Sequence, residues 1–323
     1  MPRVLHVGQT GFEAFLAKEA GAALEKGPGW ALCESERSDL CFAHLTLFEP
    51  VELRGDSVNA LAGRAADHFL ETSRTERYEK PWPLCFEAAG VAGLGARCRA
   101  VEEVFLEKTS RMARVLRLAE KGRPEPGAAR GMFLYLADFR RAFVSRIAFA
   151  GGQRRMADDP QAPSRSFLKV EEAYRVLGES PLEGESVADL GAAPGGWSYS
   201  AARRGARVVA VDNGPLKGGA LDHPLIAHAP EDAFKYFPER PVDWLFCDLI
   251  EEPGRVLELL RRWVEAGSCR RFIVNVKYGR QDPLPLLREL RSPEGGLLPR
   301  CALLRARHLY HDREEFTLVG RLK

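Results

Sequence analysis

A glycine-rich segment at residues 189–197 (DLGAAPGGW) directly follows an apolar run typical of a strand. Glycines let the backbone turn tightly and approach a ligand at the start of a following helix. Asp212 ends the next apolar run, 21 residues after Gly191, where a carboxylate commonly binds ribose hydroxyls. The pattern predicts a nucleoside-containing ligand held by Gly191, Ala193, Pro194, Gly195, Gly196 and Asp212.

Three features distinguish this loop from the dinucleotide loop of dehydrogenases. Ala193 stands where the G-x-G-x-x-G pattern needs its third glycine, and Pro194 removes a backbone N–H donor. Asp189 suits a cationic amino-acid group better than a pyrophosphate. These features favour S-adenosylmethionine over NAD. Asp232, after an apolar run at 225–229, would either accept a hydrogen bond from the adenine amino group or cap a helix.

The end of the strand-like run at 242–250 restricts which kind of atom can accept the methyl group. Residues 246–250 read FCDLI and lack the proline pair that methyltransferases of base amino groups need. Methylation of pyrimidine carbon 5 needs a cysteine nucleophile. Period-two alternation places Cys247 and Asp248 on opposite faces, so we expect Cys247 in the core.

Lys277 ends the apolar run FIVNVK at 272–277. It either extends its charge beyond the rim of the sheet or acts as a base. A ribose 2′-hydroxyl needs a base, because the neutral hydroxyl is a poor nucleophile. A free lysine has a pKa of about 10.4 and a useful base one of about 7–8. Burial and a neighbouring cation, such as a sulfonium, both favour that decrease.

Several segments together resemble the bacterial ribosomal RNA large-subunit methyltransferase M family, within the FtsJ-like ribose 2′-O-methyltransferases. They are residues 162–172 (APSRSFLKVEE), 189–197, 211–215 (VDNGP), 247–248, 275–277 and 309–315 (LYHDREE). The resemblance extends from about residue 160 to the C-terminus, roughly half the chain. The first half is similar only in the order of its elements and in a Gly-Phe-Glu near the N-terminus.

This resemblance implies a catalytic group of two lysines and two carboxylates, namely Lys169, Asp248, Lys277 and Glu315. Lys277 would be the general base, Asp248 and Lys169 would orient it, and Glu315 would hold the lysines and the acceptor. Choosing Glu315 over Glu314 depends on the family register. The implied contacts to S-adenosylmethionine are Ser166, Ala193 to Gly196, Asp212, Asp232 and Asp248. The implied substrate is a cytidine of 23S rRNA, bound by a THUMP-type N-terminal region.

The second half alternates strand-like and helix-like segments that would position these residues. Strands are expected near 187–191, 207–212, 225–229, 242–250 and 272–277, with helices between them, including 253–266. A closing pair near 301–310 and 315–322 has no helix between its strands. We predict an α/β fold with a doubly wound, mainly parallel, seven-stranded sheet, binding its ligand at the carboxyl ends of the strands.

The first half predicts a smaller α+β unit. Strands are expected at 4–7, 30–33 and 40–48, helices at 11–24, 58–71 and 101–121, and a hairpin at 132–137 and 141–150, with Pro81 and Pro83 interrupting. A linker at 151–163 separates the halves. The predicted domains are therefore an RNA-binding domain at 1–155 and a methyltransferase domain at 156–323.

The net charge of +2 averages over an uneven distribution. Residues 97–155 contain 14 basic and six acidic side chains, an excess of eight positive charges. Such a stretch is either a solvated helix face or a surface that neutralises RNA phosphates. We expect RNA as the partner, and neither DNA nor a membrane.

Composition excludes several classes of protein. With 323 residues, 45% hydrophobic and 28% charged, the chain is not mainly disordered, collagenous or multi-spanning. Seven cysteines without CxxC spacing argue against a disulfide framework and a zinc site. Without a recognisable signal sequence we expect a cytoplasmic, metal-free enzyme.

Two alternatives remain: a methyltransferase of another RNA position or of a base, and a non-catalytic RNA-binding or ribosome-assembly protein. The oligomeric state is not specified, and a monomer is compatible with the sequence.

Overall fold

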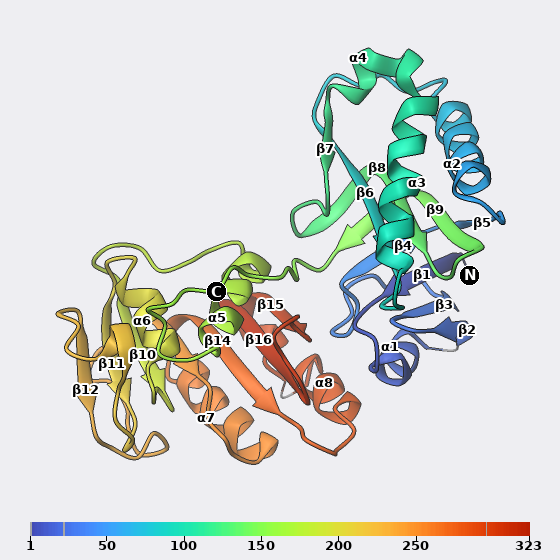
Figure 1. Ribbon diagram of the computed structural model, residues 1–323. Coiled ribbons are helices and arrows are strands. Elements are labelled where there is room, and N and C mark those ends of the chain that lie inside the picture. The colour runs from blue at the N-terminus through green and yellow to red at the C-terminus, as the bar shows by residue number, and fades with distance from the viewer. Residues whose placement is uncertain (1, 22, 295) are drawn as a thin grey trace. The chain divides into compact units, whose positions relative to one another are not determined.

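The computed structural model describes residues 2–21, 23–294 and 296–323 (Figure 1). The chain divides into two compact units, Met1–Gly152 and Gln153–Lys323, a boundary three residues before the predicted one. Residues 151–166 form neither helix nor strand and connect the two units.

Unit 1 is built on a nine-stranded sheet with the order β2-β3-β1-β4-β9-β8-β6-β7, and β5 also pairs with β9. Its strands are β1 (Arg3–Val7), β2 (Ala23–Gly27), β3 (Trp30–Glu34), β4 (Leu45–Phe48), β5 (Val51–Arg54), β6 (Trp82–Ala88), β7 (Ala119–Lys121), β8 (Gly127–Leu136) and β9 (Arg141–Ala150). Its α-helices are α1 (Glu13–Ala20), α2 (Val58–Thr72), α3 (Leu94–Lys108) and α4 (Ala113–Leu116).

Helices α2 and α3 pack side by side and bury their apolar faces in the core of unit 1 (Figure 1). Ser57 caps α2, since its hydroxyl accepts a hydrogen bond from the backbone N–H of Ala60. Phe69 of α2 and Phe105 of α3 meet edge to face and are fully buried. This core supports the long strands β8 and β9.

Several predictions for unit 1 were wrong in detail. The helix expected at 11–24 ends at Ala20, because Gly21 has a φ of 114° and Ala23–Gly27 pairs with β3. The helix expected at 101–121 is α3, which ends at Lys108, and Ala119–Lys121 pairs with β6. Strand β6 forms despite Pro83, because its pairing with β8 begins only at Leu84.

Unit 2 confirms the predicted α/β class. Its seven-stranded sheet has the order β12-β11-β10-β13-β14-β16-β15. The strands are β10 (Ser186–Leu190), β11 (Arg207–Val211), β12 (Ile226–Ala229), β13 (Val242–Cys247), β14 (Cys269–Lys277), β15 (Cys301–Arg307) and β16 (Glu315–Leu322). Strands β10 to β14 are parallel and β16 runs antiparallel to both neighbours.

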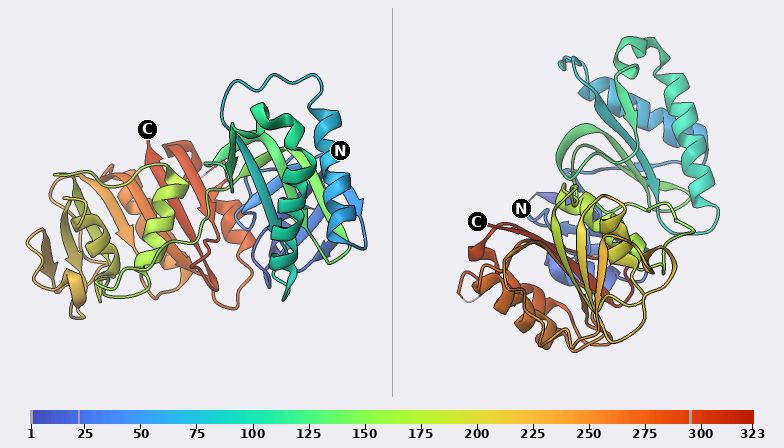
Figure 2. Two further views of the ribbon diagram at one scale, coloured as in Figure 1. Left: turned by 45° about the horizontal axis from the view of Figure 1, so that its top comes forward. Right: turned by 90° about the vertical axis from the view of Figure 1, so that its left-hand side faces the viewer.

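The helices of unit 2 cover both faces of this sheet. They are α5 (Phe167–Leu177), α6 (Gly196–Ala202), α7 (Pro253–Glu265) and α8 (Leu284–Leu290). Helices α5 and α6 lie on one face, and α7 and α8 on the other (Figure 2). Strand order reverses between β10 and β13, so their carboxyl ends form the crevice where such sheets bind ligands.

Two features of unit 2 depart from the expected alternation. The connection from β11 to β12 contains only a short 3₁₀ turn, Gly218–Ala220, and the described connection from β12 to β13 contains only turns. Strand β13 ends at Cys247, so Asp248 begins a loop. Cys247 is buried as predicted, and all seven cysteines are buried and free of disulfides. Among the described residues, no helix is long and apolar enough to cross a membrane.

Candidate active site

The glycine loop joins β10 to α6 and is shaped by positions that exclude larger side chains. Gly191 and Gly195 have positive φ angles of 77° and 108°. A Cβ on Gly191 would lie 2.8 Å from the Leu249 side chain, and one on Gly195 would lie 2.5 Å from Ala220. Both conformation and space therefore require glycine here. The Pro194 carbonyl accepts the backbone N–H of Lys217 and ties the loop to residues after β11.

We expect Gly195→Ala to weaken binding of S-adenosylmethionine and to destabilise unit 2. Gly178→Ala is a matched control, because Gly178 also has positive φ (82°) but nothing within 4 Å of an added Cβ. The free energy of unfolding of the control should fall only by the conformational cost of a side chain at positive φ, about 1–2 kcal/mol. Urea denaturation and calorimetric titration with the cofactor measure both effects. Equal losses in the two variants would contradict this account of the loop.

A cavity of about 350 Å³ opens beside the loop, and we call it the loop cavity. Its lining includes three predicted cofactor residues, Gly191, Asp212 and Asp232. The Asp212 carboxylate accepts the backbone N–H groups of Ala193 and Gly214, at 3.0 and 2.7 Å. Asp232 accepts the backbone N–H of Phe234 within a turn, and no helix starts there, so the helix-cap alternative is wrong.

A second cavity, of about 660 Å³, contains the predicted lysines, and we call it the lysine cavity. Its lining consists of Arg165, Ser166, Lys169, Lys277, Gly279, Tyr310, His311, Asp312, Arg313, Glu314 and Glu315. Ser166, at the start of α5, lies close to the glycine loop, since a Cβ on Gly196 would approach the Ser166 hydroxyl to 2.8 Å. The lysine cavity therefore borders the glycine loop.

The structure brings the four predicted catalytic residues together in two ion pairs. Lys277 Nζ lies 2.5 Å from Asp248 Oδ1 and also donates to the backbone oxygens of Asp248 and Leu249, at 3.2 and 3.0 Å. Lys169 Nζ lies 2.5 Å from Glu315 Oε1. The pairs are neighbours, because Lys277 on β14 is in register with Glu315 on β16.

The structure also distinguishes Glu315 from Glu314, which the pattern of the sequence left open. Glu315 is 7% exposed and its carboxylate pairs with Lys169. Glu314 is exposed, and its backbone oxygen accepts the N–H groups of Tyr278 and Gly279. Position 315 therefore completes the charged group, as the family register implied.

Sequence reasoning missed Asp312, a third carboxylate in the lysine cavity. It is 4% exposed and accepts hydrogen bonds from the backbone N–H of Leu309, the Asn275 amide and the Thr317 hydroxyl. Burial raises its pKa well above the ordinary value, and the nearby Glu315 carboxylate adds to this. In the sequence, Asp312 stands within the polar stretch 311–313, so no apolar pattern indicated that its side chain would be buried.

The charges around Lys169 oppose the effect of its burial. Burial acts to lower the pKa of Lys169, but the carboxylates of Asp248, Asp312 and Glu315 outweigh it, so the pKa is raised. Lys169 therefore stays an ammonium group across neutral pH. Its fixed charge holds the surrounding carboxylates in place.

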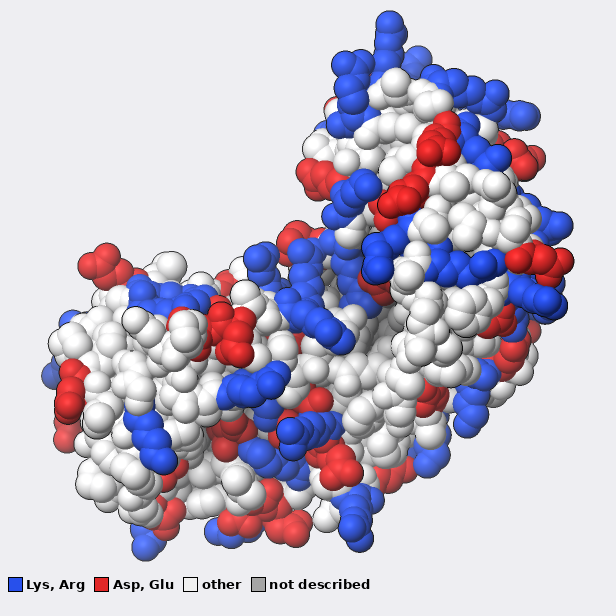
Figure 3. All heavy atoms as spheres, viewed as in Figure 1, with Lys and Arg blue, Asp and Glu red and all other residues white. Residues whose placement is uncertain are grey.

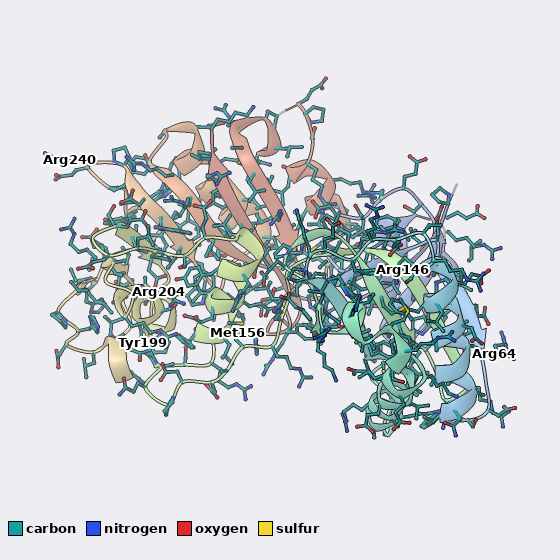
Figure 4. All side chains as sticks on the ribbon, turned by 90° about the horizontal axis from the view of Figure 1, so that it is seen from above. Arg64, Arg146, Met156, Tyr199, Arg204 and Arg240 are labelled. Atoms are coloured by element: carbon teal, nitrogen blue, oxygen red, sulfur yellow. The ribbon has the colours of Figure 1, made fainter. Side chains whose placement is uncertain are left out.

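Glu172 is a second functional candidate that sequence reasoning missed. This buried carboxylate accepts the backbone N–H groups of Arg154, Tyr310 and His311, at 3.1, 2.9 and 3.4 Å. His311 Nε2 in turn accepts the backbone N–H of Met156, labelled in Figure 4. One carboxylate on α5 thus fixes both a wall of the lysine cavity and the first residues of the connecting segment.

Asp189 lies beneath the glycine loop and is not among the residues that line either cavity. It is 1% exposed, and its Oδ2 accepts the Ser198 hydroxyl at 2.6 Å while Oδ1 has no partner. Burial raises the pKa of Asp189 to about 7.

This pKa predicts a pH-dependent contribution to stability. Folded Asp189 binds its proton more tightly than unfolded aspartate, whose pKa is about 3.9. Its stabilising contribution is therefore present below about pH 4 and is lost as the pH rises towards 7. Asp189→Asn should gain stability relative to the unsubstituted protein over that interval, measured by urea unfolding at several pH values. Parallel pH curves for the two proteins would refute this assignment.

Parts of the chain are similar to known methyltransferases. Residues 162–257 match the family model of FtsJ-like methyltransferases. The ribosomal RNA large subunit methyltransferase M of Laribacter hongkongensis is 39% identical over 220 residues, 62% of each chain. The protein of the same name from Stenotrophomonas maltophilia is 42% identical over 171 residues, 50% of this chain and 47% of that one.

These matches cover about half to three-fifths of the length of the curated relatives. Among solved structures, TrmN from Thermus thermophilus aligns over 100% of both chains with 14% identity and a TM-score of 0.37, too low to bear on the site. Residues 162–257 of the second unit therefore match the FtsJ-like methyltransferase family model, and the chain is similar over part of its length to proteins named ribosomal RNA large subunit methyltransferase M.

Proposed function

We propose that the chain is an S-adenosylmethionine-dependent 2′-O-ribose methyltransferase acting on a cytidine of 23S rRNA. The observation that carries the proposal is the pairing of Lys277 with Asp248 and of Lys169 with Glu315, beside the glycine loop. The names of the matched relatives support ribosomal RNA as the substrate.

The residues at the glycine loop fit the cofactor. Gly191, Asp212 and Asp232 line the loop cavity, and the two carboxylates suit ribose hydroxyls and an adenine amino group. Asp248 and Ser166 lie between this loop and the lysine cavity. When bound, S-adenosylmethionine supplies the methyl group.

Lys277 would take the proton of the ribose 2′-hydroxyl. Its ammonium group donates to three oxygens, those of the Asp248 side chain and of the Asp248 and Leu249 backbone. An ammonium nitrogen has no lone pair, so Lys277 must first release one proton to solvent. The neutral amine keeps only two N–H groups, so one of these three contacts is then lost. Asp248 orients Lys277, and Lys169 and Glu315 line the same cavity beside Lys277. Much of the rate enhancement would come from positioning the acceptor oxygen.

Unit 1 would bind the RNA. At least six of the 14 basic side chains in 97–155 form ion pairs within the unit, and five of these six pair with acids outside that segment. Lys108, Arg111, Arg114 and Arg117 remain exposed around the end of α3 and α4, where basic side chains gather at the top of Figure 3. These side chains suit contacts with RNA phosphates.

The proposal is tested by mapping 2′-O-methylation in 23S rRNA from cells that lack the gene. One methylated nucleotide should disappear and should return when the intact gene is supplied. The Lys277→Ala gene should fail to restore it at the same protein level. An unchanged methylation map in the deletion strain would contradict the proposal.

A further inference from the structure

Unit 1 contains a third cavity, of about 350 Å³, which we call the arginine cavity. It is lined by Glu76, Arg77, Tyr78, Glu79, Lys80, Pro81, Trp82, Arg130 and Arg146. Arg146 comes from β9 and is 7% exposed (Figure 4). A guanidinium group as deeply buried as this needs acceptors for its N–H groups.

The hydrogen bonds of Arg146 are incomplete. Nη2 donates to Glu76 Oε2 and to the Tyr78 hydroxyl, both at 2.5 Å. Nε and Nη1 are buried and have no hydrogen-bond partner. The rings of Phe69 and Tyr78 lie 4.9 and 5.8 Å from the guanidinium carbon. These rings attract the positive charge, but they supply no oxygen or nitrogen acceptor.

The lining also carries more positive than negative charge. One carboxylate, that of Glu76, pairs with both Arg146 and Arg130. Arg77 and Lys80 form no ion pair within the described part of the chain, and both are exposed. Two guanidinium groups that share one carboxylate have the capacity for a second anion.

We propose that the arginine cavity binds a phosphate group of the RNA backbone, with Arg146 and Arg130 as its ligands. The proposal rests on RNA being the substrate of the proposed function. A guanidinium group presents paired N–H donors that match the oxygens of a phosphate. Glu76 is the internal counter-ion with which the phosphate competes. Tyr78, half-buried at the cavity, offers a ring to the adjoining nucleoside.

Two substitutions with opposite expected signs test this site in the full-length chain. Glu76→Gln removes the competing charge and keeps the side-chain shape, so the affinity for an undermodified 23S rRNA transcript should rise severalfold. Arg146→Lys keeps the charge but removes the paired donors, so the same affinity should fall by about tenfold. Arg64→Lys, at an exposed arginine of α2 (Figure 4), is the matched control and should leave the affinity unchanged.

Fluorescence anisotropy at fixed salt concentration measures these affinities, and thermal unfolding verifies that each variant is folded. Weaker RNA binding in both Glu76→Gln and Arg146→Lys would make Glu76 a structural partner and overturn the proposal. Unchanged binding in both would overturn it too.

Competition by inorganic phosphate distinguishes a site for an RNA phosphate from a site for free phosphate. If the cavity binds an RNA phosphate, inorganic phosphate competes with the transcript, and it competes better in Glu76→Gln than in the unsubstituted protein. Phosphate that stabilises Glu76→Gln against heat without displacing RNA would identify a site for free phosphate and contradict the proposal. Absence of methyl transfer by the unsubstituted protein would instead count against the proposed function, because these affinities are measured without turnover.

Discussion

Lys277→Ala is expected to reduce the single-turnover rate of methyl transfer by about 10²–10⁴-fold, the usual contribution of a general base. The substitution removes the nitrogen that lies 2.5 Å from Asp248 Oδ1 at the wall of the lysine cavity. It leaves the glycine loop intact, so the dissociation constant for S-adenosylmethionine should stay within about twofold. Rapid-quench measurement of methyl incorporation and calorimetric titration give the two quantities.

Lys277→Arg distinguishes loss of a base from loss of a charge. Arginine keeps a positive charge that can donate to Asp248, but it does not give up its proton in proteins. The arginine variant should therefore be folded and about as inactive as Lys277→Ala. A rate close to that of the unsubstituted enzyme in either variant would show that Lys277 is not the base.

Lys169→Met is expected to cause the largest loss of stability at the site. The side chains of Lys169 and Glu315 are only 13% and 9% exposed. Removing the cation leaves Glu315 beside the buried carboxylate of Asp312 without compensation. Breaking a buried pair in this way typically costs about 3–5 kcal/mol. Urea denaturation at neutral pH measures the loss, which should shrink as the pH falls and the carboxylates are protonated.

The double variant Lys169→Met with Glu315→Gln separates stability from catalysis. Removing both charges should recover part of the lost unfolding free energy, because no uncompensated carboxylate remains at position 315. Methyl transfer should stay low, since neither charged side chain is present to hold the acceptor. Additive losses of stability in the two single variants would contradict a direct pairing of Lys169 with Glu315.

The periodicity of the sequence was sufficient to predict the sheet of unit 2. Each strand from β10 to β14 is a short apolar run, and function-bearing residues such as Asp212 and Lys277 stand at or just after its carboxyl end. Parallel strands bring those ends to one edge of the sheet. Residues that are far apart in the sequence but stand at strand ends therefore lie close together in the structure. The grouping of Lys169 with Glu315 could be expected only from the resemblance to the family. Lys169 lies on a helix and Glu315 on an antiparallel strand, so the pattern of parallel strands does not bring them together.

Other parts depended on tertiary contacts that no local pattern reveals. Asp312 and Glu172 are buried because backbone N–H groups from distant segments satisfy their carboxylates. The sequence did not indicate strand β6, because Pro83 interrupts the strand-like pattern. This proline is tolerated because the pairing of β6 with β8 begins only at Leu84. The basic excess of 97–155 overstated the free charge, since acids such as Glu25 and Glu87 neutralise part of it.

The most direct test of ribose methylation by this chain is analysis of the product. The purified full-length protein is incubated with S-adenosylmethionine and undermodified 23S rRNA, and the digested nucleosides are analysed by mass spectrometry. The account predicts one methylated nucleoside, with the added methyl on the sugar fragment, and none with Lys277→Ala. A methyl group on the base fragment, or no incorporation by the unsubstituted protein, would contradict it.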